Sequence, residues 1–284
     1  MTPSPATTAE KRRVFRELHE SGCFVIPNPW DVGSARYLQS LGFKALASTS
    51  SGAAWSQGLP DNGLSREQVL AHLRVMAAAT DLPLNADFEN GFAADAAGVG
   101  ESVRLAVETG VAGVSIEDSI AARDRGADSR SAGDGPLFPL EIAVERVRAA
   151  RRAIDAAGGD VMLIGRAECF LVGLPDIDMT VTRLQAYAEA GADCLYAPGI
   201  KTAAQIRAVV EAVRPKPVNL LVGAPGDLSL AQISELGVRR VSVGGALARV
   251  AWGGFMKAAR ELAEHGSFDG LAGAATHQSL NALF

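Results

Sequence analysis

The chain has 284 residues, of which 48% are hydrophobic and 21% are charged, and its formal net charge at pH 7 is −5. This composition is typical of a globular protein with a substantial core. The sequence contains no block of like charges, which argues against nucleic-acid binding and against a polybasic membrane patch. No apolar run approaches the roughly 18 residues that a membrane-spanning helix needs.

The N-terminal region carries no secretion signal that we can identify. The basic run Lys11-Arg12-Arg13 is not followed by the apolar stretch that a signal peptide requires. The three cysteines (Cys23, Cys169 and Cys194) each lie in or beside an apolar segment, and no two of them have zinc-ligand spacing. We therefore expect a cytoplasmic protein with buried free thiols.

Short apolar runs recur along the chain, separated by segments with helical periodicity. Eight such runs cover residues 23–27, 45–49, 83–87, 112–117, 161–166, 192–196, 217–222 and 239–244. Their apolar character is continuous rather than alternating, as in parallel strands that are covered on both faces. The sequence therefore predicts eight parallel strands alternating with helices.

Several of these helices have recognisable ends. Capping boxes, in which a hydroxyl and an amide satisfy the N–H groups of the first turn, begin at Ser65, Thr202 and Ser229. Glycines that permit a left-handed turn end helices at Gly42, Gly110, Gly191 and Gly237. Eight βα units favour a (β/α)8 TIM barrel over an open doubly wound sheet, and no strand is followed by the Gly-x-Gly-x-x-Gly of a dinucleotide-binding fold.

Two segments extend this barrel within one predicted domain that covers residues 1–284. Residues 1–20 predict an extra helix that plugs or flanks the base of the barrel formed by residues 21–250. Residues 251–284 predict a helical tail with a Gly/Ala-rich stretch near 270–275. Because such tails often pack on a neighbouring subunit, we expect a homo-oligomer, either a dimer or a tetramer.

The active site of a (β/α)8 barrel is built from the C-terminal ends of its strands and the loops that follow. The polar residues at those ends, in chain order, are Asn28, Trp30 and Asp31; Ser48 to Gly52; Asp87 and Glu89; Glu117 and Asp118; Arg166 and Glu168; Tyr196; and Asn219. At least four carboxylates from the third, fourth and fifth strands thus crowd one end of the barrel. Such groups repel one another unless a cation neutralises them.

Oxygen ligands without histidine favour a hard cation, and a few carboxylates plus water suit Mg²⁺ best, with Mn²⁺ as an alternative. None of the four histidines (His19, His72, His265 and His277) falls at a strand end, so a zinc hydrolase is disfavoured. The alternative role for these acids is to cap helices or to pair with Arg166.

Three further features each allow two interpretations, one functional and one structural. Arg166 could clamp a substrate carboxylate or form a buried salt bridge. Residues 50–53 could be a turn whose N–H groups hold a carboxylate, or an ordinary βα turn. The polar segment 119–139 could close over the site as a lid, or be an insertion without a role.

Taken together, the strand-end motifs resemble the isocitrate lyase / phosphoenolpyruvate mutase superfamily over roughly residues 20–250. The motifs are Asn28-Pro-Trp-Asp31 with Ser34-Ala-Arg36, Ser51-Gly52, Gly58-Leu-Pro-Asp61, Asn85-Ala-Asp87-Phe-Glu89-Asn-Gly91, Gly113-Val-Ser-Ile-Glu117-Asp118 and Gly165-Arg166-Ala-Glu168. Each is weak alone, but their order and spacing on successive strands are specific.

The resemblance implies a Mg²⁺ ion near Asp87 that binds a small 2-oxo or 2-hydroxy carboxylate, and a reaction through an enolate. The implied metal ligands are Asp87, Glu89 and Glu117, directly or through water. The implied catalytic residues are Arg166, Asp61 and Glu117. The substrate-binding residues are expected to be Trp30, Ser51, Gly52, Ala53, Arg166 and Asn219.

The sequence also departs from the family pattern. The lyases carry a Lys-Lys/Arg-Cys-Gly-His motif on the lid, whereas the segment from Ser119 to Arg130 contains neither Cys nor His. The Pro-Lys-x-Asn-Ser lid of the mutases is also missing, and the third strand carries Asp-Phe-Glu in place of Asp-x-Asp. The chain is therefore similar to a mutase-like branch without the lid cysteine.

These features leave three functions open. The first is Mg²⁺-dependent cleavage of a C–C bond, by a retro-aldol reaction or a decarboxylation. The second is phosphonopyruvate or phosphoenolpyruvate P–C chemistry, as a mutase or hydrolase. The third is binding of a 2-oxo acid without catalysis.

Overall fold

The computed structural model describes residues 5–120 and 135–284. Its strands form one eight-stranded parallel sheet in the order β1-β8-β7-β6-β5-β4-β3-β2. The strands are β1 (Phe24–Ile26), β2 (Leu46–Ala47), β3 (Leu84–Asp87), β4 (Gly113–Glu117), β5 (Met162–Arg166), β6 (Cys194–Tyr196), β7 (Val218–Leu221) and β8 (Arg240–Ser242). Each strand lies within one of the eight apolar runs.

The two edges of this sheet, β1 and β2, approach each other and nearly close it. The Ala47 N–H donates to the Pro27 carbonyl at 3.0 Å, and Asn28 Nδ2 donates to the Ser48 carbonyl at 3.0 Å. Asn28 Oδ1 also accepts the N–H groups of Val243 and Gly244 after β8. The predicted (β/α)8 barrel is confirmed.

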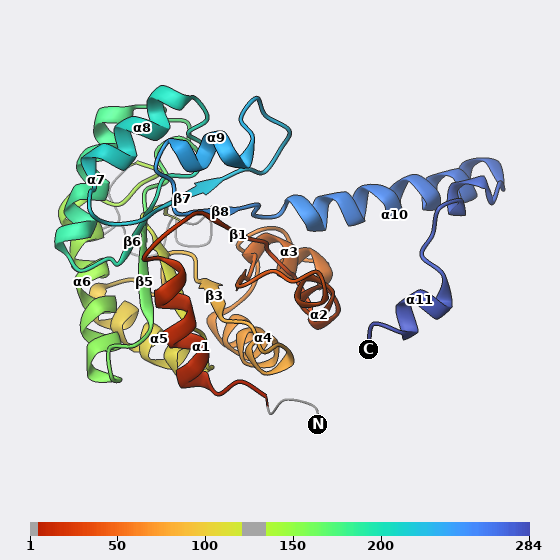
Figure 1. Cartoon of the computed structure of the whole chain (residues 1–284), viewed down its shortest axis with the longest axis horizontal. Helices are drawn as coiled ribbons and strands as arrows, with labels where there is room; N and C mark the ends of the chain where they lie inside the picture. The colour runs from red at the N-terminus through yellow and green to blue at the C-terminus, as the bar shows by residue number, and fades with distance from the viewer. Residues whose placement is uncertain (1–4, 121–134) are drawn as a thin grey trace.

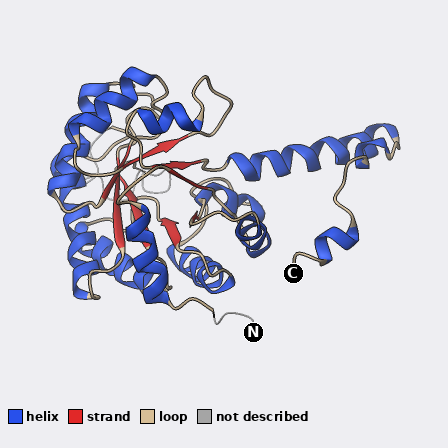
Figure 2. Ribbon diagram, in the orientation of Figure 1, coloured by secondary structure: helices blue, strands red, loops and turns tan. Residues whose placement is uncertain are grey.

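Helices surround the strands on the outside (Figure 2). They are α1 (Thr8–Leu18), α2 (Val32–Ser40), α3 (Ser50–Ser56), α4 (Arg66–Ala79), α5 (Ala96–Val107), α6 (Leu140–Ala156), α7 (Ile177–Glu189), α8 (Ala203–Ala212), α9 (Leu230–Glu235), α10 (Ala246–His265), the 3-10 helix η2 (Asp269–Leu271) and α11 (His277–Asn281). The predicted capping boxes at Ser65, Thr202 and Ser229 are all formed. Gly42, Gly110, Gly191 and Gly237 all have positive φ angles, as expected of residues that end helices.

The extra helix α1 closes the base of the barrel. Phe15 is fully buried and packs in the inner cluster that includes Ile26 and Met162. Arg12 holds the same helix against the residues that precede β4 and β5. Its Nε donates to the Val111 carbonyl at 3.0 Å, and its Nη1 lies 3.0 Å from Asp160. The prediction of a helix at the barrel base is confirmed.

The C-terminal helix α10 does not lie back against the barrel. Figure 1 shows it leaving the molecule beyond β8, with η2 folded on its far end and α11 returning toward α2. Phe284, the last residue, lies beside Gly33 at the start of α2. The predicted helical tail is confirmed, and its first helix begins at Ala246.

Most of the segment expected to act as a lid, residues 121–134, lies outside the described residues. The two ends of that segment are joined by an antiparallel bridge between Ser119 and Leu137 and by the Ile120 N–H, which donates to the Pro136 carbonyl at 2.9 Å. Among the residues that the structure does describe, no helix is long and apolar enough to cross a membrane.

Candidate active site

A cavity of about 190 Å³ opens at the C-terminal ends of the strands. Five of the predicted site residues line it: Ser51, Asp61, Asp87, Arg166 and Asn219. Five others lie outside this lining: Trp30, Gly52, Ala53, Glu89 and Glu117. A cavity below the ~300–1,000 Å³ of typical ligand sites suits a small metabolite.

Arg166 is the centre of an acidic cluster at one side of this cavity. Its Nη1 lies 3.1 Å from Asp87 Oδ1 and 3.2 Å from Glu117 Oε2. Its Nε pairs with Glu168, and its guanidinium lies 5.0 Å from the centre of the Tyr196 ring. The side chain is 15% exposed, so in this structure Arg166 makes the buried salt bridge that the sequence left as an alternative.

Asp87 is fixed by two serines from the end of β2. Its Oδ2 accepts hydrogen bonds from the Ser50 backbone N–H at 3.1 Å and from Ser50 Oγ at 2.9 Å. Its own N–H donates to Ser48 Oγ at 2.9 Å. Together with Arg166, these contacts hold the carboxylate in one orientation at the cavity wall. The sequence placed both serines at a strand end but gave neither this role.

The cluster contains more carboxyl groups than cationic groups. Burial, followed by the nearby Asp87, raises the pKa of Asp61. Burial also raises the pKa of Glu117, and it raises the pKa of Glu168 to about 8 although Arg166 opposes the shift. Four carboxylates thus share one guanidinium, an arrangement that a further cation would stabilise.

The donor set fits a hydrated Mg²⁺ ion better than a fully enclosed metal site. In the part of the chain that the structure describes, no three His, Cys, Asp or Glu side chains converge on one point. Asp61 and Asp87 both line the cavity, and Ser50 interacts with each of them. One or two carboxylates supplemented by water and substrate oxygens are what Mg²⁺ accepts in proteins.

Glu89 and Glu117 lie behind this surface. Glu89 is buried, has a φ of +47°, and accepts the Glu117 N–H on its backbone carbonyl at 2.9 Å. The Glu117 side chain is 11% exposed and pairs with Arg166. The sequence could not distinguish these acids from those that line the cavity, because all of them follow strands in the same way.

The segment predicted as a carboxylate-binding turn is the first turn of α3. Thr49 caps this helix: its Oγ1 accepts the Gly52 N–H at 3.3 Å, and its carbonyl accepts the Ala53 N–H at 3.0 Å. A Cβ on Gly52 would lie 2.8 Å from the Cβ of Trp30, so these two residues pack together behind the cavity. Only Ser51 of the three predicted residues reaches the cavity lining.

A second buried network joins the ends of β4 and β5. Asp118 Oδ1 accepts the Glu168 N–H at 2.8 Å. Asp118 Oδ2 accepts hydrogen bonds from the Tyr187 hydroxyl at 2.6 Å and from Arg183 Nη1 at 3.0 Å. This network positions the neighbouring acids, and no local sequence signal connects Asp118 to α7.

The deeper layer of the cavity contains a buried arginine that the sequence did not indicate. Arg240 is 2% exposed, and its Nε donates to Asn219 Oδ1 at 2.8 Å. His19 Nε2 lies 3.5 Å from Arg240 Nη1, while His19 Nδ1 lies 2.7 Å from the Phe15 carbonyl. Because the carbonyl only accepts, Nδ1 carries the proton of a neutral His19, and burial lowers the pKa of His19 to about 3.

Comparison with known proteins agrees with this architecture. The family described as phosphoenolpyruvate phosphomutase matches residues 15–263 of the chain. The chain belongs to this family. A crystal structure of a candidate lyase/mutase from Burkholderia cenocepacia J2315 superposes with a TM-score of 0.89, at 45% identity over 97% of this chain and 96% of the other.

Two further relatives are C–C lyases by name. The oxaloacetate decarboxylase of Paraburkholderia xenovorans is 31% identical over 82% of this chain and 75% of its own length. The 2-methylisocitrate lyase of Escherichia coli is 34% identical over 62% of this chain and 57% of its own length. The predicted resemblance is therefore confirmed: the chain is an enzyme of the isocitrate lyase / phosphoenolpyruvate mutase superfamily.

Proposed function

We propose that the chain is a Mg²⁺-dependent lyase that cleaves a C–C bond in a small 2-oxo or 2-hydroxy carboxylic acid. The observation that carries this proposal is the surplus of carboxylates around Arg166 beside a cavity of about 190 Å³. The relatives named as a decarboxylase and a methylisocitrate lyase support C–C chemistry.

In this proposal Asp87 and Asp61 hold the cation, which could also be Mn²⁺. Glu117 and Glu89 lie outside the cavity lining and would act through water. When bound, the ion would supply Lewis acidity to the oxygens of the substrate. Burial and the nearby Asp87 raise the pKa of Asp61, and a bound cation would favour its ionised form.

The remaining residues would bind and orient the acid. Ser51 and Asn219 offer polar groups to its carboxylate from opposite parts of the lining. Arg166 would stabilise the negative charge that builds up as the bond breaks, because its guanidinium is already held in place by carboxylates and needs no reorganisation.

A turnover assay tests this proposal. The protein is incubated with oxaloacetate, methylisocitrate or 2,3-dimethylmalate, with and without Mg²⁺, and release of the 2-oxo acid product is followed. We expect metal-dependent release from at least one acid by the wild type and a loss of about 100-fold or more in Asp87→Asn.

The other two functions predict different results, which two further measurements detect. Phosphonopyruvate consumed in a phosphorus NMR spectrum, with no C–C cleavage, would establish P–C chemistry instead. Thermal stabilisation by these acids without any turnover would establish a binding protein. Absence of any metal-dependent product would contradict the lyase.

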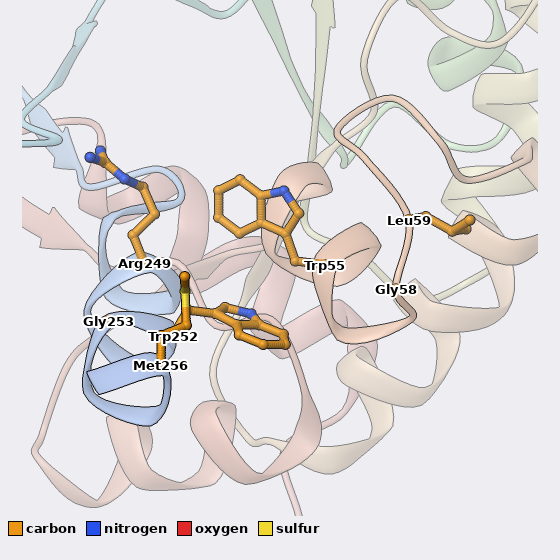
Figure 3. A pocket seen from close by; sticks show the side chains of 7 residues that line it. All are labelled: Trp55, Gly58, Leu59, Arg249, Trp252, Gly253 and Met256. Carbon is orange, nitrogen blue, oxygen red and sulfur yellow. The ribbon is translucent and has the colours of Figure 1, made fainter. Parts of the chain in front are cut away.

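We also propose that the chain forms a homo-oligomer in which α10 packs on a second copy. One face of this helix carries Trp252, Phe255 and Met256, which are 39%, 62% and 52% exposed. Next to it lies an apolar cavity of about 480 Å³ between α3 and α10, lined by Trp55 from α3 and by Trp252 and Met256 from α10 (Figure 3). Monomers rarely expose a continuous apolar surface of this kind.

A second copy is the occupant that this geometry favours. The helix leaves its own barrel and so can reach another one, and a mutual exchange of such helices buries both faces in a closed two-fold arrangement. Light scattering on the purified chain should therefore give a dimer or a larger even assembly. Phe255→Glu should shift it toward monomer, and a wild type that is monomeric at micromolar concentration would contradict the proposal.

A further inference from the structure

Arg240 on β8 is a buried cation in the deeper layer of the cavity. It lines the cavity and is 2% exposed. Among the residues that the structure describes, no Asp or Glu pairs with it. The ionisable groups beside it are Cys194 and Tyr196, and burial raises the pKa of both, so they are neutral near pH 7. A buried guanidinium keeps its proton, and its burial without a counter-charge is costly.

The groups that hold Arg240 in place are also neutral. Its Nε donates to Asn219 Oδ1 at 2.8 Å. Its Nη1 lies 3.4 Å from Asn85 Oδ1 and 3.5 Å from His19 Nε2. His19 carries no charge near neutral pH, because burial lowers its pKa to about 3. These contacts solvate the positive charge with dipoles but do not neutralise it.

One nitrogen of this guanidinium, Nη2, has no partner within the described part of the chain. Because Arg240 lines the cavity, Nη2 is the nitrogen that can donate into it. A carboxylate usually binds arginine through two parallel hydrogen bonds, which need two free nitrogens on one edge. Here Nε and Nη1 are already engaged by Asn219 and Asn85. A single free donor suits a spherical anion better than a planar one.

Ser115 on β4 provides a second donor to the same space. It lines the cavity, and its Oγ accepts a hydrogen bond from Asn85 Nδ2 at 2.9 Å. The contact of Asn85 Oδ1 with Arg240 fixes the orientation of that amide, so its nitrogen must face the serine. Ser115 Oγ therefore accepts, and its own hydrogen is donated to no residue that the structure describes. This hydrogen can be donated to a ligand.

The same arrangement recurs between β7 and β8. Asn219 accepts from Arg240 Nε and donates through its Nδ2 to Ser242 Oγ at 3.0 Å. The Ser242 and Tyr196 hydroxyls also interact with each other, which uses one of their two hydrogens and leaves the other. Both residues line the cavity. We call the following groups the donor floor: Arg240 Nη2 and the hydroxyls of Ser115, Ser242 and Tyr196.

We infer that the donor floor binds one small inorganic monoanion of the halide class, such as chloride. The cavity has room for about six water-sized groups at ~30 Å³ each, enough for such an ion beneath a three-carbon acid. The anion neutralises Arg240 and accepts the remaining hydroxyl hydrogens, so it stabilises the folded chain by binding to it. This site is separate from the proposed cation site at Asp87 and does not depend on the proposed function.

Thermal unfolding at constant ionic strength tests the inference without turnover and without added metal. The full chain is dialysed into sodium gluconate, whose anion is too large for the donor floor, and sodium chloride or sodium bromide then replaces the gluconate. The melting temperature should rise to saturation, by about 5 °C at about a hundredfold excess over the dissociation constant. Sodium acetate, which supplies a carboxylate instead, should change it by less than about 1 °C.

Three variants assign the effect to the donor floor. Arg240→Met removes the cation with little change of volume and should abolish the dependence on halide. Arg207→Met removes an exposed arginine from α8 and changes the net charge equally, so it is the matched control and should keep the full rise. Ser115→Ala should raise the half-saturating halide concentration about tenfold.

A direct measurement decides the matter even if Arg240→Met does not fold. Anomalous diffraction from wild-type crystals soaked in bromide should show a bromide ion in hydrogen-bond contact with Arg240 Nη2. Bromide found only elsewhere, no saturating rise in the wild type, or equal halide dependence in Arg240→Met and Arg207→Met would overturn the inference. Stabilisation by acetate but not by halide would overturn it too, because the donor floor would then take a carboxylate. None of these results involves Mg²⁺ or a 2-oxo acid, so this failure is distinct from a failure of the proposed function.

Discussion

The buried carboxylate of Asp118 offers a sharp test of how the acidic end of the barrel is held together. Its side chain is 2% exposed and accepts hydrogen bonds from the Glu168 N–H, the Tyr187 hydroxyl and Arg183. Asp118→Asn keeps the shape of the side chain and removes its charge. The amide oxygen can still accept the Glu168 N–H, but the amide nitrogen cannot accept from Arg183.

The expected loss of unfolding free energy follows from the environment in which Asp118→Asn leaves Arg183. The Arg183 side chain is 11% exposed and pairs with Asp118 at 3.0 Å, so the variant leaves a nearly buried cation without its carboxylate. Breaking one side of such a pair costs about 3–5 kcal/mol of unfolding free energy. Tyr187→Phe removes only one of the three hydrogen bonds and should cost about 1–2 kcal/mol.

Urea unfolding followed by circular dichroism measures both variants against the wild type. The expected order of stability is wild type, then Tyr187→Phe, then Asp118→Asn. If Asp118→Asn lies within about 1 kcal/mol of the wild type, or is no less stable than Tyr187→Phe, the network does not have the role assigned to it.

Three further predictions concern other parts of the molecule. The pKa of His19 is about 3 in the folded chain against an ordinary 6.5, so the unfolded chain binds a proton first as the pH falls. The stability that neutral His19 contributes is therefore complete above pH 6.5 and is lost progressively down to about pH 3. Between pH 6.5 and 4.5, His19→Gln should therefore lose about 2–3 kcal/mol less stability than the wild type; His277→Gln is the exposed control, and equal slopes would contradict the assignment. Ser50→Ala removes one of two hydrogen bonds to Asp87 Oδ2 and should lower kcat/KM about tenfold in steady-state assays; unchanged kinetics would show that this contact does not matter. Gly52→Ala would place a Cβ 2.7 Å from Thr49 Cγ2 and should cost about 1–3 kcal/mol in thermal unfolding, whereas Gly100→Ala, with its nearest contact at 3.5 Å, should not; equal stabilities would refute the close packing.

Features encoded in short segments were predictable from the sequence. The strands were found because each is a continuous apolar run, and the helix starts at Ser65 and Thr202 because a capping box spans four residues. The placement of Asp87 and Arg166 at one end of the barrel follows from the parallel direction of the strands, since parallel strands bring their C-terminal ends to the same edge.

Contacts between distant segments were not predictable in this way. Arg240 on β8 contacts His19, the residue that follows α1, across 221 positions, and neither residue stands in a distinctive local pattern. The division between acids that line the cavity, such as Asp61, and acids behind it, such as Glu89, depends on side-chain direction. The turn expected at Gly52 is a helix because the preceding Thr49 supplies its cap.

The direction of α10 could not be predicted from the sequence either. An amphipathic pattern shows that one face of a helix is buried, but it does not identify the surface that buries it. In this chain the apolar side chains of α10, including Phe255, remain exposed. The sequence could therefore predict the tail but not its course away from the barrel.

The central claim is that Asp87 and Asp61, beside Arg166, form a divalent-cation site for a 2-oxo acid. Calorimetric titration of Mg²⁺ into the wild type and into Asp87→Asn, each with pyruvate present, tests it most directly. The account predicts uptake of one Mg²⁺ per chain by the wild type and little or none by a folded Asp87→Asn variant. No uptake by the wild type, or equal uptake by both proteins, would contradict it.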